Sequence, residues 1–360
     1  MDPQPDTEMP LWTAPAASSL DRRSLLRLGL SGFALAAGGI RPASGQQARY
    51  LRIATGSAAG TYFPVGETMA RLLSHPPGLP PCDPGAACGV PGLIATSETS
   101  EGSVANVQAV AGGAVETALA QADVISWAQT GSGLFADKPA MANLRVIANL
   151  YAESMHLVVR RDAKIASVKD LKGKRVSLDR PGSGSRVDAL LILAAHGIKQ
   201  SALKVFELGP SQASDALAGG EIDAFFFLGG APAATVLDIA GGDQIDLVPI
   251  AGEVRDKLLS QARYFTATVI PAGTYPGIGE TPTLSVGAQW ICAAERNEEL
   301  IYDITRSLFD PVNRPVLEAS HPKAAEISLA NATRGIAVAL HPGAIRFYRE
   351  MGITLPPNAI

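Results

Sequence analysis

The chain has 360 residues, and its 30 lysines and arginines against 34 aspartates and glutamates give a formal net charge of −4 at pH 7. This balance excludes a nucleic-acid-binding protein that depends on a basic surface, because phosphate binding needs clustered positive charge. A hydrophobic share of 47% with 18% charged residues excludes a disordered chain, and the length favours two domains.

The first 45 residues have the three parts of a secretory signal. A charged region around Arg22 and Arg23 is followed by a short apolar segment at 28–37 and by small residues up to Gly45. The paired arginines are typical of the twin-arginine export route. We therefore expect residues 1–45 to be an export signal; a frayed amphipathic helix is the alternative.

Two cysteines lie close together in a stretch rich in proline and glycine at 75–91. Because export permits disulfides, Cys82 and Cys88 are predicted to pair. Closing a loop of about seven residues stabilises by roughly 2 to 2.5 kcal/mol, enough to fix the loop but not to hold a domain. A zinc site would need four ligands, and no second pair of cysteines or histidines accompanies these two. Cys292, in an apolar run at 284–293, is interpreted as an inert buried thiol.

The mature chain opens with a strand, a turn of small residues and a helix. The strand is predicted at 50–54 and the turn at 55–61, and apolar residues then follow at helical spacing. The apolar stripe consists of Val65, Met69, Leu72 and Leu73. This order is typical of an α/β fold.

The same pattern recurs in the next seventy residues. A strand is predicted at 93–95, a polar turn at 97–103 and a helix at 104–111. The apolar run at 119–125 predicts a further strand.

A third repetition begins with a strand at 174–178 and a turn at 181–185. A helix starts near Val187, and Gly197 is a suitable residue to end it. The apolar run at 221–228 predicts a strand that is covered on both faces. Strands alternating with helices indicate a largely parallel sheet.

Two extended segments, at 151–160 and 264–270, bracket this third repetition. If the chain leaves one lobe near Ala152 and returns near Phe265, the two crossings form a hinge beneath a cleft. Two independent Rossmann-like domains are the alternative. In the bilobal interpretation lobe 1 consists of residues 46–151 and 265–360, and lobe 2 consists of residues 152–264.

The three strand-to-helix turns suit a small anion. Ligands of open α/β sheets bind beyond the carboxyl ends of the strands, where free N–H groups and helix dipoles favour negative charge. The turn at 182–185 is not a dinucleotide fingerprint, because Val187 stands where the third glycine belongs. Each turn could instead be an ordinary capped helix. Arg186 would pair with the anion or be solvated.

Two further side chains accompany these turns. Tyr62 supplies a ring and a hydroxyl beside the first turn, and Gln121 supplies an amide on a strand. Half-buried packing of Tyr62 and a satisfied amide at Gln121 are the alternatives.

Signatures of catalysis are missing from the sequence. The five histidines have no metal-ligand spacing, and no His-Glu-x-x-His, Gly-x-Ser-x-Gly or Cys-x-x-Cys motif occurs. His196 suits the last turn of a helix. His156, in the first crossing, is the one histidine that we keep as a candidate functional residue. We therefore expect no enzyme, no cofactor and no metal; an enzyme whose residues only the fold assembles is the alternative.

The order of the motifs resembles the TAXI-type solute receptors of TRAP transporters over nearly all of residues 50–310. The motifs are IATG at 53–56, YFPVG at 62–66, GSVAN at 102–106, QADV at 121–124, HLVVR at 156–160, DLKGKRV at 170–176, PGSGSR at 181–186, DAFFF at 223–227 and IPAGTYPG at 270–277.

The resemblance implies a bilobal periplasmic binding protein of type II, with two doubly wound sheets joined by the two-crossing hinge. Such a receptor would deliver a small anionic solute, glutamate or a related amino acid, 2-oxoglutarate or a dicarboxylate, to a TRAP-type permease. The ligand residues that it implies are Gly56, Ser57, Tyr62, Ser100, Ser103, Gln121, Ser183, Gly184 and Ser185.

Two departures from the family pattern concern the ligand. Ser57-Ala58-Ala59 replaces a glycine-rich run, and Glu101 adds a negative charge beside the expected anion. A receptor of the same fold that reports to a sensor protein, or a secreted enzyme on this scaffold, would be the rival functions.

Overall fold

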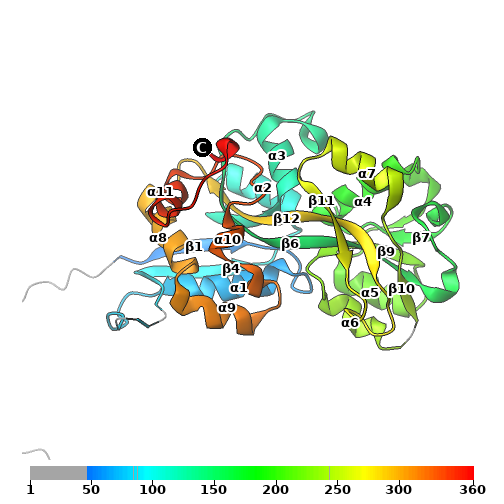
Figure 1. Ribbon diagram of the computed structural model, residues 1–360, viewed down its shortest axis with the longest axis horizontal. Helices are drawn as coiled ribbons and strands as arrows, with labels where there is room; N and C mark the ends of the chain where they lie inside the picture. The colour runs from blue at the N-terminus through cyan, green and yellow to red at the C-terminus, as the bar shows by residue number, and fades with distance from the viewer. Residues whose placement is uncertain (1–46, 84, 87, 243) are drawn as a thin grey trace, which may run out of the picture. The chain divides into compact units, whose positions relative to one another are not determined.

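The computed structural model describes residues 47–360 except 84, 87 and 243 (Figure 1). The expected export signal lies outside the described residues. The described chain belongs to one compact unit, Gly45–Ile360. Among its helices we find none with the length and apolar character of a membrane span.

Twelve strands of the described chain pair into one continuous sheet. The strands are β1 (Arg49–Ala54), β2 (Ser74–His75), β3 (Val90–Pro91), β4 (Leu93–Glu98), β5 (Thr117–Gln121), β6 (Leu144–Arg160), β7 (Arg175–Ser177), β8 (Lys204–Phe206), β9 (Ala224–Gly229), β10 (Ile245–Leu247), β11 (Phe265–Ile270) and β12 (Thr281–Ala293). Their order is β3-β2-β4-β1-β5-β12-β6-β9-β7-β8, with β10 beside β6 and β11 beside β12.

Helices connect the strands and cover the sheet. The α-helices are α1 (Tyr62–Leu73), α2 (Ser103–Ala111), α3 (Ala122–Thr130), α4 (Gly184–Ala195), α5 (Pro210–Ala218), α6 (Ala234–Ala240), α7 (Gly252–Gln261), α8 (Glu298–Leu308), α9 (Arg314–Ser320), α10 (Leu329–Ala332) and α11 (Pro342–Glu350). Short 3-10 helices are η1 (Gly133–Phe135), η2 (Arg161–Ala163), η3 (Val168–Leu171), η4 (Gln200–Ala202), η5 (Pro311–Asn313), η6 (Ala324–Glu326) and η7 (Pro357–Ala359).

The first strand, turn and helix form as predicted. The apolar stripe of α1, from Val65 to Leu73, is buried against β4 and α8. Burying each such side chain stabilises the fold by about 1.5–3 kcal/mol, which explains why the stripe fixes the orientation of α1. The predicted end of α4 is also found, because Gly197 follows the C-cap with φ 69°.

The strand predicted at 119–125 is wrong in its second half. β5 ends at Gln121, which has an extended backbone, and α3 begins at Ala122. Both segments are buried, and a continuous apolar run does not distinguish a buried strand from a buried helix. The turn between them brings Gln121 to the carboxyl end of β5.

Two long strands, β6 and β12, join the two halves of the sheet. β6 pairs with β12 from Leu144 to Ser154 and with β9 from Ser154 to Val159, both antiparallel. The outer strands β1, β4 and β5 on one side and β7, β8 and β9 on the other pair in parallel. The two expected parallel sheets are therefore continuous through β6 and β12, and the α/β bilobal fold class is confirmed (Figure 1).

The buried side chains form separate cores in the two halves of the sheet. The first core draws on residues 51–151 and 288–359, and the others draw mainly on residues 155–286. Phe265 packs in a core of the second group, because β11 pairs with β12 before β12 crosses between the halves. The division of the chain into two lobes stays a prediction. If the two groups of cores are taken as the lobes, the chain returns to the first lobe near Gly287 and not at Phe265.

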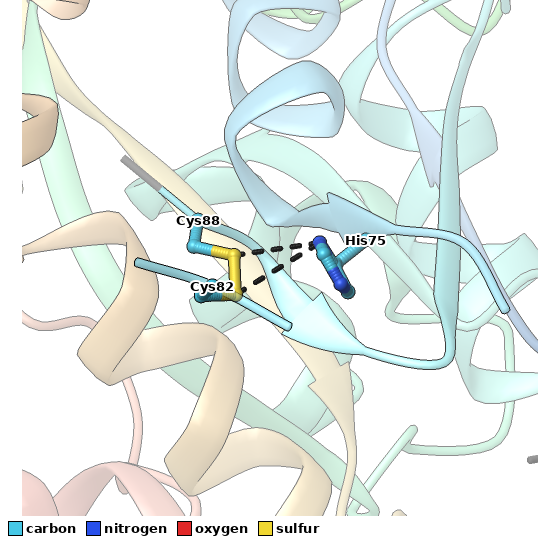
Figure 2. Close-up of side chains that lie close together, drawn as sticks. All are labelled: His75, Cys82 and Cys88. Atoms are coloured by element: carbon cyan, nitrogen blue, oxygen red, sulfur yellow. Dashed lines mark hydrogen bonds between the residues drawn. A yellow bond between two sulfur atoms is a disulfide. The ribbon is translucent and has the colours of Figure 1, made fainter. Parts of the chain in front are cut away.

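Cys82 and Cys88 form a disulfide between α1 and β4. Their sulfur atoms lie 3.9 and 3.4 Å from Nδ1 of His75 (Figure 2). Cys292 is fully buried, and burial raises the pKa of its thiol, which agrees with an inert side chain.

Candidate functional site

A cavity of about 380 Å³ opens among the strand-to-helix turns. Segments of both halves of the sheet line it, including the turns before α1, α2 and α4. The nine residues that the resemblance implies as ligands all line this cavity, although their role in binding stays a prediction. They are Gly56, Ser57, Tyr62, Ser100, Ser103, Gln121, Ser183, Gly184 and Ser185.

Tyr62 connects α1 to the middle of β6. Its hydroxyl donates a hydrogen bond of 2.7 Å to Oε2 of Glu153 and lies 3.4 Å from Oγ of Ser103. Burial and the neighbouring Glu153 raise the pKa of Tyr62 well above its usual value, so the hydroxyl keeps its proton. Tyr62 is therefore both a packed ring and a polar group of the cavity wall.

A second chain of hydrogen bonds runs from α2 to α4. Ser103 donates to Oε1 of Gln121 at 3.0 Å, and Nε2 of Gln121 donates to Oδ2 of Asp188 at 2.9 Å. The predicted alternative of a satisfied amide therefore holds for Gln121. A Cβ atom on Gly184 would overlap the Gln121 amide, so only glycine allows this approach.

The N-terminus of α2 already has a partner. The backbone N–H groups of Val104 and Ala105 donate to the carbonyl oxygen of Gly182 at 3.0 and 3.3 Å. The expectation that this turn offers free N–H groups to an anion is wrong at these two residues. The carbonyl comes from the turn before α4, which the sheet brings opposite α2.

Three further serines of the site bond to segments around the cavity. Ser183 donates to Asp179 at 2.7 Å and caps α4, Ser185 accepts from the N–H of Leu228 at 3.0 Å, and Ser100 donates to the carbonyl of Thr55 at 3.1 Å. Their hydroxyl groups fix the shape of the cavity.

The cavity wall carries more acidic than basic groups. Glu101, Glu153 and Asp179 line it, whereas Arg180 is the one cation among the lining residues of the described chain. Arg180 lies 3.8 Å from Glu101 and donates to Gln212 at 2.8 Å. Arg186 pairs with Glu207 at 2.8 Å and does not line the cavity, so neither predicted role of Arg186 is found.

Burial changes the protonation of the carboxyl groups. Burial raises the pKa of Glu153 to about 8, opposed by the Tyr62 hydrogen bond. Behind Gln121, Asp123 and Asp188 are a fully buried pair, and burial raises the pKa of Asp123 to about 6 and that of Asp188 well above its usual value. Glu153 and one member of the pair are therefore protonated at neutral pH.

Sequence reasoning missed Glu153, Asp179 and Thr61. The signal for Glu153 is a single acidic residue within a long, mostly apolar extended segment. Thr61 accepts from the N–H of Gly230 at 2.8 Å, which joins the two halves of the sheet beside the cavity. Such a contact across 169 positions has no local sequence signal.

The histidines do not enter the cavity wall. His156 bonds to Tyr275 through Nε2 at 2.8 Å and to the carbonyl of Ser154 through Nδ1 at 2.9 Å, and burial lowers its pKa to about 4. His75 with the two disulfide cysteines is a cluster of metal-ligand residue types within the described chain. The disulfide leaves those cysteines without the thiolate that metal binding requires.

The chain belongs to the NMT1-like family, whose model matches residues 53–352. Three solved structures are similar to this chain at low identity. A protein from Bordetella bronchiseptica RB50 is 16% identical over 88% of this chain and 85% of that one, with a TM-score of 0.47. The MOPS-bound alkanesulfonate-binding protein SsuA from Xanthomonas axonopodis pv. citri is 16% identical over 86% of each chain, with a TM-score of 0.43.

The third is a binding protein component of an ABC phosphonate transporter from Pseudomonas aeruginosa. It is 12% identical over 78% of this chain and 80% of that one, with a TM-score of 0.47. At these identities and TM-scores, the likenesses say nothing about the solute of this chain. The TAXI-type resemblance is finer than the family membership and stays a prediction.

Proposed function

We propose that this protein is an extracytoplasmic solute receptor of the TAXI type. It captures a small anionic solute, with an acidic amino acid such as glutamate or 2-oxoglutarate as the leading class, and delivers it to a TRAP-type permease. Residues 1–45 would direct export through the twin-arginine route, and the mature protein would act in the periplasm. The proposal includes no covalent step.

The observation that carries the proposal is the composition of the cavity wall. The nine residues that the resemblance implies as ligands line one cavity of about 380 Å³, a volume suited to a small metabolite. The wall comes from segments that pack in different cores, and contacts such as Thr61 to Gly230 and Val104 to Gly182 join them. A solute that touches both sides favours their closed arrangement, because only differential affinity shifts such an equilibrium.

Isothermal titration tests the binding step. The purified protein is unfolded and refolded to remove bound solute, and then titrated with glutamate, glutamine, 2-oxoglutarate and C4 dicarboxylates. We expect saturable binding of at least one solute with a Kd of about 1 μM or tighter, which corresponds to about −8 kcal/mol. If the refolded protein is native and binds none of them, the anionic-solute proposal is wrong.

Uptake assays test the partner. Cells that lack the receptor gene are complemented with it and supplied with the labelled solute that binds. Uptake that collapses with the ion gradient supports a TRAP-type permease, whereas uptake that follows ATP supply contradicts it. Binding without any uptake would favour the sensory receptor. Conversion of the solute by the pure protein would reveal an enzyme.

A further inference from the structure

Glu153 has one carboxyl oxygen without a partner beside the cavity. The residue lines the cavity and is 3% exposed. Its Oε2 accepts the hydrogen bond from Tyr62 at 2.7 Å, and no hydrogen bond in the described part of the chain reaches its Oε1. This oxygen is not among the fully buried side-chain atoms without a partner in the described chain, so it is open to the cavity, where a polar group can meet it. The solute can supply that group.

The charged and titratable groups around Glu153 favour a cation at this oxygen. Tyr62 faces it from α1, Asp123 from α3, Asp188 from α4 and Lys323 from the segment before η6. Lys323 is already paired, because its Nζ lies 2.7 Å from Oε1 of Glu326. The two aspartates make the electrostatic potential at Glu153 negative, which disfavours a negative charge on its carboxyl group. Together with burial, this keeps Glu153 protonated in the empty site.

Two kinds of solute group could meet the free oxygen. A protonated Glu153 could donate to a carboxylate, which would bring negative charge toward Asp123 and Asp188, or to a neutral carbonyl oxygen, which would leave the repulsion among the acids as it is. An ammonium group would instead form a charge-assisted hydrogen bond and reduce the repulsion among the acids. The electrostatic argument therefore selects the ammonium. A carboxylate of the same solute would form an ion pair with Arg180, the cation among the described lining residues.

We propose that Glu153 receives the ammonium group of the bound solute, so that the solute is an amino acid and not the corresponding keto acid or dicarboxylate. This inference rests on the proposed receptor function and narrows its solute. Glu153 is then the residue that separates glutamate from 2-oxoglutarate, which share both carboxylates.

Binding of an amino acid should also release a proton. The ammonium group keeps its protons, the carboxyl group of Glu153 gives up its one proton to the buffer, and an ion pair remains. Below a pH of about 8, where Glu153 is protonated in the empty site, up to one proton leaves for each solute bound. Well above that pH no proton is released.

The test compares L-glutamate, 2-oxoglutarate and glutarate on the wild-type protein. We expect glutarate and 2-oxoglutarate to bind about tenfold or more weakly than glutamate. Titrations at pH 6.5 in two buffers of different ionisation enthalpy should show proton release with glutamate. This arm needs no variant. Equal affinity for the three solutes, or tighter binding of 2-oxoglutarate, would overturn the inference and leave the receptor function standing.

A variant isolates the carboxyl group. Glu153→Gln should weaken glutamate binding by about tenfold or more, abolish the proton release and leave the affinity for glutarate nearly unchanged. Glu67→Gln, an exposed change on α1, is the matched control for loss of one carboxylate. If Glu153→Gln binds glutamate as the wild type does, the inference is wrong. If the wild type binds none of the three solutes, the proposed receptor for acidic solutes fails, and this inference fails with it.

Discussion

Nε2 of Gln121 donates a hydrogen bond of 2.9 Å to Oδ2 of Asp188. Gln121 ends β5 in one half of the sheet, and Asp188 lies in α4 of the other half. Both side chains are buried, at 3% and 1% exposure, so this bond has no competition from water. It holds the two halves together beneath the cavity.

Gly184→Ala tests the closeness of this contact. The new methyl group would overlap the Gln121 amide, so the amide must leave Asp188 or α4 must move away. We expect a loss of stability of about 1–3 kcal/mol and solute binding weakened by about tenfold or more. Urea unfolding and titration calorimetry measure the two effects. Gly279→Ala, where the added carbon meets no atom within 4 Å, is the control and should change neither quantity.

Tyr62→Phe removes the donor to Glu153 and keeps the ring. Oε2 of Glu153 would lose its partner within a buried site, which costs about 1–3 kcal/mol of unfolding free energy. The exposed Tyr50→Phe is the control and should leave stability unchanged. Combining Tyr62→Phe with Glu153→Ala, which unlike glutamine leaves Tyr62 no acceptor, in a double-mutant cycle measures the coupling of the two side chains. Strict additivity would contradict the bond.

The Asp123 and Asp188 pair should make stability fall as the pH rises. Burial raises the pKa of Asp123 from 3.8 to about 6 in the folded protein, so the folded state holds more protons than the unfolded chain between these values. The protonated Asp123 therefore contributes fully to the free energy of unfolding below a pH of about 4. This contribution falls as the pH rises and is lost once the pH passes about 6.

Asp188→Asn keeps an acceptor for Gln121 and removes one titratable carboxyl group of the pair. Relative to the wild type, this variant should gain stability progressively as the pH rises above about 4, because burial raises the pKa of Asp188 in the folded protein and an amide does not titrate. Thermal unfolding across that range measures the difference, with the exposed Asp215→Asn as the control. A difference that does not change with pH would argue against the raised pKa of Asp188.

Removing the disulfide should loosen one loop and leave the cavity intact. The double change Cys82→Ser with Cys88→Ser should lower the unfolding free energy by at most about 2 to 2.5 kcal/mol, the entropy of closing a short loop. Solute affinity should stay at the wild-type value, because neither cysteine lines the cavity. Wild-type protein treated with a thiol reductant should behave in the same way. A clear change in affinity would connect this loop to binding.

The helices and strands of this protein follow from local sequence patterns. The stripe of α1 and the glycine after α4 are determined by neighbours along the chain, since burial periodicity and left-handed backbone conformations are local properties. The strand-to-helix turns could be located for the same reason, whereas the individual ligand residues at them came from the resemblance to a family. The end of β5 within the apolar run at 119–125 could not be predicted, because an apolar run is compatible with a buried strand and with a buried helix.

The sequence by itself determined the α/β class, and its resemblance to a family pointed to nine residues that line one cavity. Only the tertiary structure decided the charge of that cavity. Glu153, Asp123 and Asp188 come from three different elements, and their protonation depends on burial and mutual distance, which no local pattern encodes. For the same reason the carbonyl of Gly182 could occupy the N-terminus of α2, where the sequence indicated a place for an anion.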